Sequence, residues 1–440
     1  MPQIIVREKD NTRVGVGLYT NFSVLIPGLV SEDADGLGFD ENGVCECSSK
    51  DDFKKHIGYV RAQDLTIIPA SGETEAVMAK HYGNQIAYEL IELGYTVLYK
   101  KVTETTASDL KEDTFWAALK DKSIYDFRYV LSGFIGQPEV DAAIARLANS
   151  TYNSEENEDN GRGDCVALID IPDIYYTADN KTQAEAVTAI KGYVNTLSGE
   201  NVSPYVAYFA PYVDYIFDKK VLNIYGEDNG SSLRFPASFH YLACAAKAAE
   251  NYNEWYAIAG YNLGISNLAI KGVGCRFGDQ AVRALQPRYK KLSGGIQCAV
   301  NLIETIRGSY YLWGNRTAKA LGDENGDEAD LKASHFLNIR QLCSSIKKQI
   351  YITCRRHTFN PNSDLLWGDF CADIRPLLEK MKGDQGVRDY RFIKVKVNQK
   401  ALLKAIIRIV PIEAVEDFDV TLTLEDSLSG ILIDDEDVAA

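Results

Sequence analysis

Residues 165–172 read CVALIDIP, a continuous apolar run that is typical of a β-strand buried on both faces. Residues 183–197, QAEAVTAIKGYVNTL, have helical spacing, and residues 205–213, YVAYFAPYV, read as a second buried strand. A strand, a helix and a strand in this order predict a βαβ unit with a right-handed crossover. The first half of the chain is therefore predicted to be α/β.

A helix and a strand are expected upstream of this unit. The apolar residues within 71–93 have helical spacing, with Ser71 as the expected cap and Gly94 as the expected end. Residues 95–102, YTVLYKKV, are predicted to form a strand. The polar and acidic residues 149–164 should form an exposed loop.

The C-terminal part of the chain is predicted to contain two helices followed by antiparallel strands. A second acidic loop, at residues 321–330, leads to a helix over residues 336–357. The next helix spans residues 365–382, with Asp364 as its expected cap, and Pro376 should kink or split it. Period-two alternation of apolar residues predicts strands at residues 392–397, 406–410 and 420–424.

Length, composition and charge exclude several classes of protein. A chain of 440 residues is long for one core and suits two domains or more. With 62 acidic against 47 basic residues, the net charge of -15 opposes binding to nucleic acid and to an acidic membrane surface. No apolar run reaches the roughly 20 residues of a spanning helix, so a soluble protein made in the cytoplasm is expected. The nine cysteines, an odd number, are expected to be reduced and mostly buried.

No motif in the sequence specifies a catalytic or cofactor site. Gly15 and Gly17 lack the third glycine of a dinucleotide loop and the Gly-Lys-Ser/Thr of a P-loop, so a turn is expected there. Neither a GxSxG elbow nor an HExxH pair occurs. Asp170 ends a buried strand, where α/β enzymes often place a carboxylate, and this keeps an enzyme of unknown reaction as an alternative.

Two short segments resemble metal sites only in part. Cys45 and Cys47 have no second Cys or His pair at ligand spacing, and a surface loop is expected for them. Asp323, Asn325 and Asp327 alternate as in a calcium loop, but the glycine and the final glutamate of that loop are missing, which favours a solvated loop. We therefore predict no metal ion and no cofactor.

Residues 308–318, GSYYLWGNRTA, place a tryptophan beside a tight polar turn. Trp313 is a large apolar anchor, and Gly314 permits a positive φ. Arg316 presents a planar fork of donors that suits a carboxylate or several carbonyls. None of the three is a nucleophile or a general base, so the segment is predicted to serve packing or an interface.

This segment resembles a motif of the contractile tail sheath proteins, found in phages and related injection machines, that runs Gly-Ile-Asn, then a glycine-led turn, then Trp-Gly-Ala-Arg-Thr. Gln297 and Asn315 depart from the motif, and the matching residues are Gly295, Ile296, Gly308, Trp313, Gly314, Arg316 and Thr317. The helix that follows resembles the family's Ile-Asn-Val-Arg-Arg-Leu helix, with Gln341 in place of the second arginine and matches at Asn338, Arg340 and Leu342.

Further segments are similar to the family in the same order along the chain. Residues 359–367 resemble its Phe-Glu-Pro-Asn segment. Residues 406–418 are similar to its closing strand, although the proline of the following Pro-Ala-Glu-Phe element is missing. Upstream, residues 235–263 resemble its Pro-Pro-Ser helix and the turn after it, with two prolines replaced. The resemblance covers residues 165–424, whereas residues 31–164 match no known segment.

The resemblance implies a structural subunit that polymerises helically around an inner tail tube and contracts to drive that tube through a cell envelope. The implied partners are other copies of the chain, the inner tail tube protein, and the baseplate and tail terminator proteins, with no nucleic acid and no membrane insertion. The implied place is a virion tail or injection apparatus assembled in the host cytoplasm, and no enzymatic activity is implied. A non-polymerising binding module is the second alternative.

The resemblance also implies a multi-domain subunit of mixed α/β type. An N-terminal arm is expected at residues 1–20, and a variable outer and α/β domain at residues 21–234. A C-terminal core domain of the conserved type, including a C-terminal strand arm, is expected at residues 235–424. The acidic tail at residues 425–440 is expected to be exposed.

Three groups of residues receive roles through this resemblance. The terminal arms add strands to neighbouring subunits in the family, which assigns that role here to Gln3, Ile4, Ile5, Val6, Val420, Leu422 and Leu424. The predicted core packing motif consists of Trp313, Gly314, Arg316, Thr317, Asn338 and Arg340. A tube must be held and then released, which favours screened charges, and the tube-facing candidates are Lys380, Lys382, Arg388 and Arg391.

Overall fold

The structure is a computed structural model that describes most of the 440-residue chain. It covers residues 22–60, 63–67, 77–102, 107–134, 137–149, 152–153, 158–159, 161–177, 181–217, 232–286, 297–321, 331–396 and 402–414. Several predictions concern residues outside these ranges. They are the N-terminal arm, the glycine turn at residues 15–17, the cap at Ser71, the calcium-like residues 323–327 and the strand at residues 420–424.

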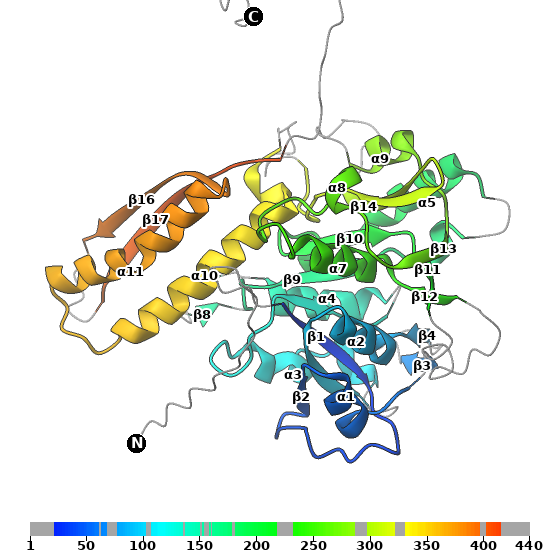
Figure 1. Cartoon of the computed structure of the whole chain (residues 1–440), viewed down its shortest axis with the longest axis horizontal. Coiled ribbons are helices and arrows are strands. Elements are labelled where there is room, and N and C mark those ends of the chain that lie inside the picture. The colour runs from blue at the N-terminus through cyan, green and yellow to red at the C-terminus, as the bar shows by residue number, and fades with distance from the viewer. Residues whose placement is uncertain are drawn as a thin grey trace, which may run out of the picture.

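An eight-stranded sheet forms the centre of the molecule (Figure 1). Its inner strands are parallel, and an antiparallel strand lies at each edge. Across the sheet, the order is β15 (Ser309–Trp313), β14 (Val300–Ile306), β10 (Val206–Ala210), β9 (Val166–Asp170), β6 (Tyr129–Leu131), β1 (Ser23–Leu29), β5 (Thr96–Val102) and β2 (Val44–Cys47). The sheet thus takes strands from both sides of residue 234, where the domain boundary is predicted.

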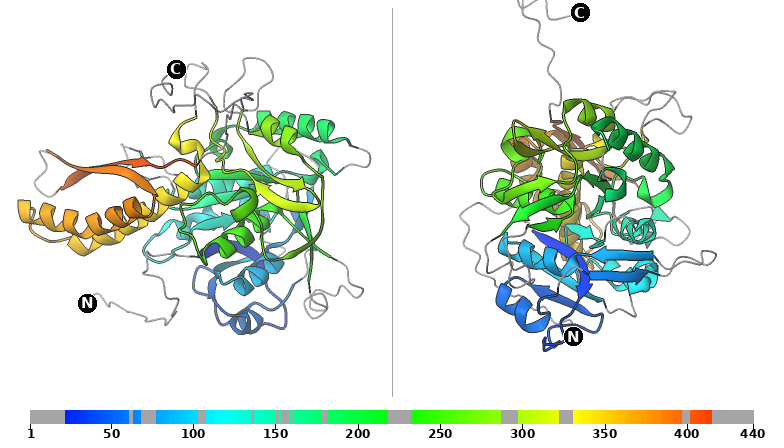
Figure 2. Two further views of the ribbon diagram at one scale, coloured as in Figure 1. Left: turned by 45° about the horizontal axis from the view of Figure 1, so that its top comes forward. Right: turned by 90° about the vertical axis from the view of Figure 1, so that its right-hand side faces the viewer.

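Helices cover both faces of this sheet, which gives three layers (Figures 1 and 2). One face packs against α3 (Asp113–Trp116), α4 (Pro138–Ala148), α5 (Gln183–Thr196) and α9 (Asp279–Leu285). The other face packs against α1 (Lys50–His56), α2 (Gly83–Glu92) and α7 (Ala237–Ala248). Because successive residues of a strand point to opposite faces, Leu168 and Ile169 enter different cores. Burial stabilises the fold by about 1.5–3 kcal/mol for each such large apolar side chain.

The predicted βαβ unit is confirmed, since β9 and β10 are parallel neighbours on either side of α5 in the sequence. A capping box between Thr182 and Glu185 fixes the first turn of α5. The second strand ends at Ala210, earlier than predicted, because Pro211 has no N–H with which to continue a central strand. The chain then enters a three-stranded sheet of β11 (Val213–Ile216), β12 (Leu233–Phe235) and β13 (Ala269–Val273).

The helix predicted over residues 71–93 is wrong in its first half. Val77–His81 form β4, which pairs antiparallel with β3 (Gln63–Ile67), and α2 begins only at Gly83. The apolar spacing of this short stretch fits either period, and pairing with β3 satisfies its backbone groups as a strand. The predicted end of the helix is confirmed, because Gly94 follows it with a φ of 88°. The strand predicted next is β5.

The loop predicted to be exposed at residues 149–164 is buried at its end, so that prediction is wrong there. Arg162 is 1% exposed and Asp164 is 5% exposed. The Arg162 guanidinium donates to both carboxylate oxygens of Asp164 and to the Leu119 carbonyl, and it lies 4.2 Å from the centre of the Phe127 ring. These bonds satisfy charges that would otherwise need solvent.

Two long helices and a hairpin project from the side of this body (Figures 1 and 2). The projection consists of α10 (Leu337–His357), α11 (Asp364–Gly383), β16 (Val387–Val395) and β17 (Lys404–Pro411), all predicted as elements from the sequence. The two strands are antiparallel neighbours. The projection has its own small core of Trp255, Leu342, Ile346, Phe370, Cys371, Ile374, Leu378, Met381 and Val387.

Helix α11 departs from its prediction at two residues. Its cap is Ser363 and not Asp364, since the Ser363 side chain accepts a hydrogen bond from the Leu366 N–H. Pro376 does not split the helix, which continues to Gly383. Ile374 and Leu378 are buried in the projection core on either side of Pro376, and this packing stabilises the helix against the loss of one backbone bond.

The remaining elements are short. They are β7 (Tyr152–Asn153), β8 (Glu158–Asp159), α8 (Gly260–Leu263) and the 3-10 helices Ala107–Lys111, Ala117–Lys120, Asp173–Tyr175, Gly199–Asn201 and Ala333–His335. Over the ranges that the structure covers, no helix has both the length and the apolar character needed to cross a membrane. All nine cysteines are described and free, and six of them are buried, which confirms the prediction that most of them are buried.

Candidate functional site

The turn after β15 connects the edge of the central sheet to the start of α10. Gly314 lies so close to β14 that an added Cβ would be 2.7 Å from Asn301 Oδ1 and 2.6 Å from Gln286 Nε2. The expectation of a positive φ at Gly314 is wrong, because the residue with that geometry is Gly308, at φ 85° in the preceding hairpin turn. Glycine is needed at position 314 for close approach of the backbone.

Asn315 holds the N-terminus of α10. Its backbone carbonyl accepts from the Leu337 N–H at 2.9 Å, and its Oδ1 accepts from the Asn338 N–H at 3.0 Å. Its Nδ2 donates to Asn338 Oδ1, and Asn338 Nδ2 in turn donates to the Trp255 carbonyl. The helix residue before Leu337, Phe336, offers no side-chain cap, so Asn315 replaces one from a distant segment.

Asn301 on β14 fixes the same turn from the sheet side. It is fully buried, its Oδ1 accepts from the Arg316 N–H at 2.8 Å, and its Nδ2 donates to the Arg316 carbonyl at 2.8 Å. Arg316 and Thr317 are themselves 2% and 1% exposed. The segment that the sequence analysis selected is thus a buried polar junction between sheet and helix.

Trp313 and Arg340 lie at the margin of this junction. Trp313 is half-buried, its ring meets that of Tyr261 edge to face at 5.2 Å, and its carbonyl accepts from Gln286 Nε2. The Arg340 guanidinium lies 4.3 Å from the centre of the Tyr205 ring. Both side chains pack, but neither is deep in the core.

Charged side chains attach α10 to the amino ends of the central strands. Arg128, directly before β6, donates to Gln341 Oε1 at 2.6 Å and forms an ion pair with Glu254. Arg128 and Glu254 are 4% and 3% exposed in their side chains. Lys348 forms an ion pair with Asp126 and donates to the Phe127 carbonyl at 2.7 Å.

These charged residues were missed by the sequence analysis. A charge that is spaced among apolar helix residues, such as Lys348, reads as part of a solvated face, and only tertiary contact shows that it is buried. Asn301 offered one signal, because a lone asparagine inside the apolar run of β14 needs hydrogen-bond partners.

The hairpin of the projection has two different faces. Tyr390, Phe392, Ile407 and Ile409 pack toward the projection core. On the opposite face Arg391 lies directly across from Arg408, and Ile406 and Val410 are 43% and 47% exposed. Like charges directly opposite each other are destabilising, and exposed apolar residues around them suit a surface that another chain covers.

The edges of the hairpin are also open in the described part of the chain. There β16 pairs with β17 alone, and each strand keeps one edge without a partner strand. A free strand edge offers a row of backbone donors and acceptors to a further strand. The expected arm residues at both termini lie outside the described residues, so their contacts stay a prediction.

The basic tube-facing candidates lie on the projection. Lys380 and Lys382 are in the last turn of α11, and Lys382 forms a 3.4 Å ion pair with Asp389. Arg388 and Arg391 are exposed on β16. Their contact with another protein stays a prediction.

The alternative of an enzyme rests on buried polar groups near the carboxyl ends of β6 and β9. Asp170 accepts from the Ser238 N–H and hydroxyl at 2.8 and 2.6 Å, and burial raises the pKa of Asp170 to about 7 although these bonds lower it. Asp141 is 2% exposed. Burial is the larger cause of its raised pKa, and the negative charge of the nearby Asp170 is a smaller cause. Asp170 thus serves the start of α7.

Of the residues considered for metal binding, Cys45 and Cys47 lie in the described part of the chain. Cys45 and Cys47 are buried on β2 with their sulfur atoms 3.6 Å apart, so the expected surface loop is wrong. The alternating pattern of a half-buried strand explains their place better than a loop does. Within the described residues no group of three or more His, Cys, Asp or Glu side chains could hold a metal ion.

Comparison with known proteins relates the whole architecture to one class of assembly. No family model and no curated protein matches the chain. Among solved structures, the sheath of the extracellular contractile injection system PVC, in its contracted state, is 13% identical with a TM-score of 0.59 and covers 97% of this chain and 98% of its own.

Two structures of the anti-feeding prophage are equally similar. A chain of its six-fold symmetrised baseplate is 14% identical with a TM-score of 0.58, over 97% of this chain and 99% of that chain. Its helical sheath in the contracted state is 13% identical with a TM-score of 0.57, over 96% and 99%. The chain therefore has, over nearly its whole length, the mixed α/β fold of contractile sheath proteins.

Proposed function

We propose that this chain is a structural subunit of a contractile sheath, which polymerises helically around an inner tube and contracts to drive that tube through a cell envelope. The observation that best supports the proposal is the fold shared with contracted sheaths over 97% of this chain and 98% of the other. A binding module or an enzyme could share part of this fold without matching a sheath subunit from end to end.

The projection supplies the surfaces that such a polymer needs. Terminal arms of neighbouring copies, through residues 1–20 and 417–426, add strands to the free edges of β16 and β17. Each copy gives arms in one direction and receives them in the other, so the contact is heterologous and propagates a helix. Main-chain bonds along a strand persist while subunits rotate, which suits a lattice that changes packing without coming apart.

The buried junction between body and projection gives this lattice rigid units. Through the Asn315 cap, the hydrogen bond from Arg128 to Gln341 and the ion pair of Lys348, α10 is fixed at both the sheet edge and the strand ends. A pull on the hairpin is then transmitted to the whole body. The predicted domain boundary at residues 234 and 235 divides this lattice unit into an outer and a core part.

The proposed partners are other copies of the chain, an inner tube protein, a baseplate and a tail terminator, in a tail or injection apparatus assembled in the host cytoplasm. The tube contact is assigned to Lys380, Lys382, Arg388 and Arg391. No catalytic activity is part of the proposal.

Electron microscopy of the purified chain tests the proposal. Full-length protein should form striated helical tubes, because sheath contacts are made between identical copies. Deletion of residues 1–8 should leave a folded monomer without long tubes, since main-chain bonds between copies are lost while the described core residues are all retained. A full-length chain that stays monomeric at high concentration contradicts the sheath proposal, whereas ordered tubes from the deletion variant contradict only the arm assignment.

A further inference from the structure

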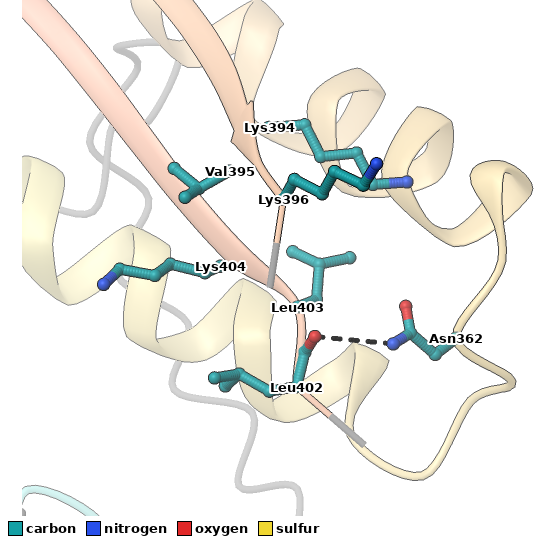
Figure 3. A pocket seen from close by; sticks show the side chains of 7 residues that line it. All are labelled: Asn362, Lys394, Val395, Lys396, Leu402, Leu403 and Lys404. Atoms are coloured by element: carbon teal, nitrogen blue, oxygen red, sulfur yellow. Dashed lines mark hydrogen bonds between the residues drawn. The ribbon is translucent and has the colours of Figure 1, made fainter. Parts of the chain in front are cut away.

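A pocket of about 270 Å³ lies at the free end of the β16–β17 hairpin, beside the turn between α10 and α11 (Figure 3). Val395, Leu402 and Leu403 form its apolar walls, and Lys396 and Lys404 border it. Asn362 from the turn donates to the Leu402 carbonyl at 3.4 Å, which ties the hairpin end to the helices.

The pocket combines apolar walls with three lysines. A third lysine, Lys394, forms a 2.7 Å ion pair with Asp364. Lys396 and Lys404 are exposed, and no carboxylate of the described ranges forms an ion pair with either. In Figure 3 the amines of Lys394 and Lys396 point to one side of Leu403 and that of Lys404 to the other. An extended acidic segment that lies over Leu402 and Leu403 would therefore contact lysines on both sides.

The turn that supplies Asn362 to the pocket, and the start of α11 after it, also expose large apolar side chains. Phe359 is 101% exposed, Leu365 is 73% exposed, and Leu402 in the pocket wall is 41% exposed. In a chain of net charge -15, a surface with these apolar side chains and two lysines that have no ion-pair partner among the described residues is complementary to an acidic and apolar segment.

The chain itself contains a segment of that chemistry. Residues 431–437 read ILIDDED, three apolar residues followed by four acidic ones. Sixteen residues separate this segment from residue 414, where the described part of the chain ends. The apolar triplet fits the Val395, Leu402 and Leu403 walls, and the carboxylates fit the lysines.

We propose that this pocket binds residues 431–437 of a neighbouring copy of the chain. The inference rests on the proposed function, in which residues 417–426 of one copy add a strand to the hairpin of the next. A strand antiparallel to β17 begins beside Pro411 and ends beside Lys404, because β17 runs from the free end of the hairpin toward the body. The ten residues 417–426 span about 34 Å and β17 about 27 Å, so the following segment emerges at the pocket.

Cross-linking in assembled tubes tests the contact. Copies labelled with nitrogen-15 and unlabelled copies are mixed in equal amounts, assembled, and treated with a carbodiimide, which joins a lysine amine to an adjacent carboxylate. We expect amide links from Lys396 or Lys404 to residues 434–437, about half of them between copies of different label. Links found only within one label class mean that the segment binds its own copy and overturn the proposal, as does the absence of such links in tubes.

Charge exchange tests its contribution to assembly. Lys396→Glu with Lys404→Glu, and separately Asp434→Lys with Asp435→Lys, should each raise the critical concentration for tube formation about tenfold at low salt. Combining all four substitutions should restore much of the loss. Lys54→Glu with Lys55→Glu, which makes the same charge change on the exposed surface of α1, is the matched control and should have no effect.

The two proposals fail in different ways. If the full-length chain forms no tubes, the sheath proposal fails. If it forms tubes whose critical concentration is the same in the pocket variant and the control, only the pocket assignment is wrong.

Discussion

At the scale of single residues, the junction after β15 depends on one residue without a side chain and on side chains that form hydrogen bonds. Gly314 is glycine because β14 leaves no room for a Cβ, and Asn315 caps a helix that begins 22 residues later. Asn301 bonds both backbone groups of Arg316. These contacts account for the glycine and the two asparagines at this junction.

Substitution of Gly314 by alanine should therefore destabilise the protein by about 1–3 kcal/mol, because the new methyl group overlaps Asn301 and its neighbour Gln286. Gly192→Ala is the matched control, since a Cβ at this position of α5 meets nothing within 4 Å. The control should gain about 0.5–1 kcal/mol from helix propensity. Urea unfolding of both variants measures the difference, and equal stability of the two contradicts the steric account.

The buried carboxyl of Asp170 should make stability depend on pH. Its pKa is raised from 3.8 to about 7, so between these values the native state holds a proton that the unfolded state has released. The stability that this carboxyl contributes is therefore fully present below about pH 4 and is lost as the pH rises through 7.

We expect Asp170→Asn to reduce the loss of unfolding free energy between pH 5 and pH 8, because the amide does not titrate. Asp369→Asn, on the exposed surface of α11, should leave that loss as it is in the unmodified chain. Chemical denaturation at the two pH values gives the comparison. An equal pH dependence in all three proteins would show that Asp170 is ionised in the native state.

At the scale of elements, α10 has two functions along its 21 residues. Gln341 and Lys348 attach it to the residues that precede β6, and other side chains of the same helix pack against α11 in the projection. Leu342 and Ile346 pack into the projection core between the polar contacts. The helix thus contacts both the body and the projection core.

Removing the charge of Arg128 should test this attachment. Arg128→Met leaves Glu254 buried without its partner, which should cost about 3–5 kcal/mol of unfolding free energy. The matched control is Arg146→Met, whose ion pair with Asp113 is exposed and should cost less than about 1 kcal/mol. Denaturant unfolding monitored by tryptophan fluorescence follows both cores, and equal costs in the two variants would contradict the buried attachment.

At the scale of the whole molecule, the chain forms a three-layer body and a narrow projection (Figures 1 and 2). The body has large cores on both faces of its sheet, whereas the projection has one small core and, among the described residues, two strand edges without a partner strand. If the proposed sheath function is correct, the surfaces that exchange partners during contraction are expected on the projection. The basic residues of α11 and β16 lie there too.

Charge reversal on the projection should weaken attachment to an inner tube. Lys380→Glu with Lys382→Glu should reduce co-assembly with the tube protein, most strongly at low salt, where charges are least screened. Empty sheath tubes should still form, since the strand edges are unchanged. Co-sedimentation over a salt series measures the effect, and unchanged tube binding would move the contact to another surface.

The sequence by itself determined the elements whose pattern is local and long. The apolar run of β9, the capped helix α5, the two helices of the projection and the alternation of β17 all follow from residue spacing, because burial on both faces or on one stripe leaves a periodic record. The resemblance in the segment around Trp313 indicated the sheath fold, which the solved structures support.

Tertiary structure alone decided the rest. Strand β4 took its form from pairing with β3, since a short apolar stretch fits both periods and only a partner strand selects one. Arg162, Arg128 and Lys348 became buried because groups distant in the sequence meet them, and no local pattern records such contacts. These groups are the Leu119 carbonyl, the Glu254 carboxylate and the Asp126 carboxylate. The pocket at the hairpin end likewise exists only where a turn between helices and a hairpin end come together, since neither segment alone encloses a space.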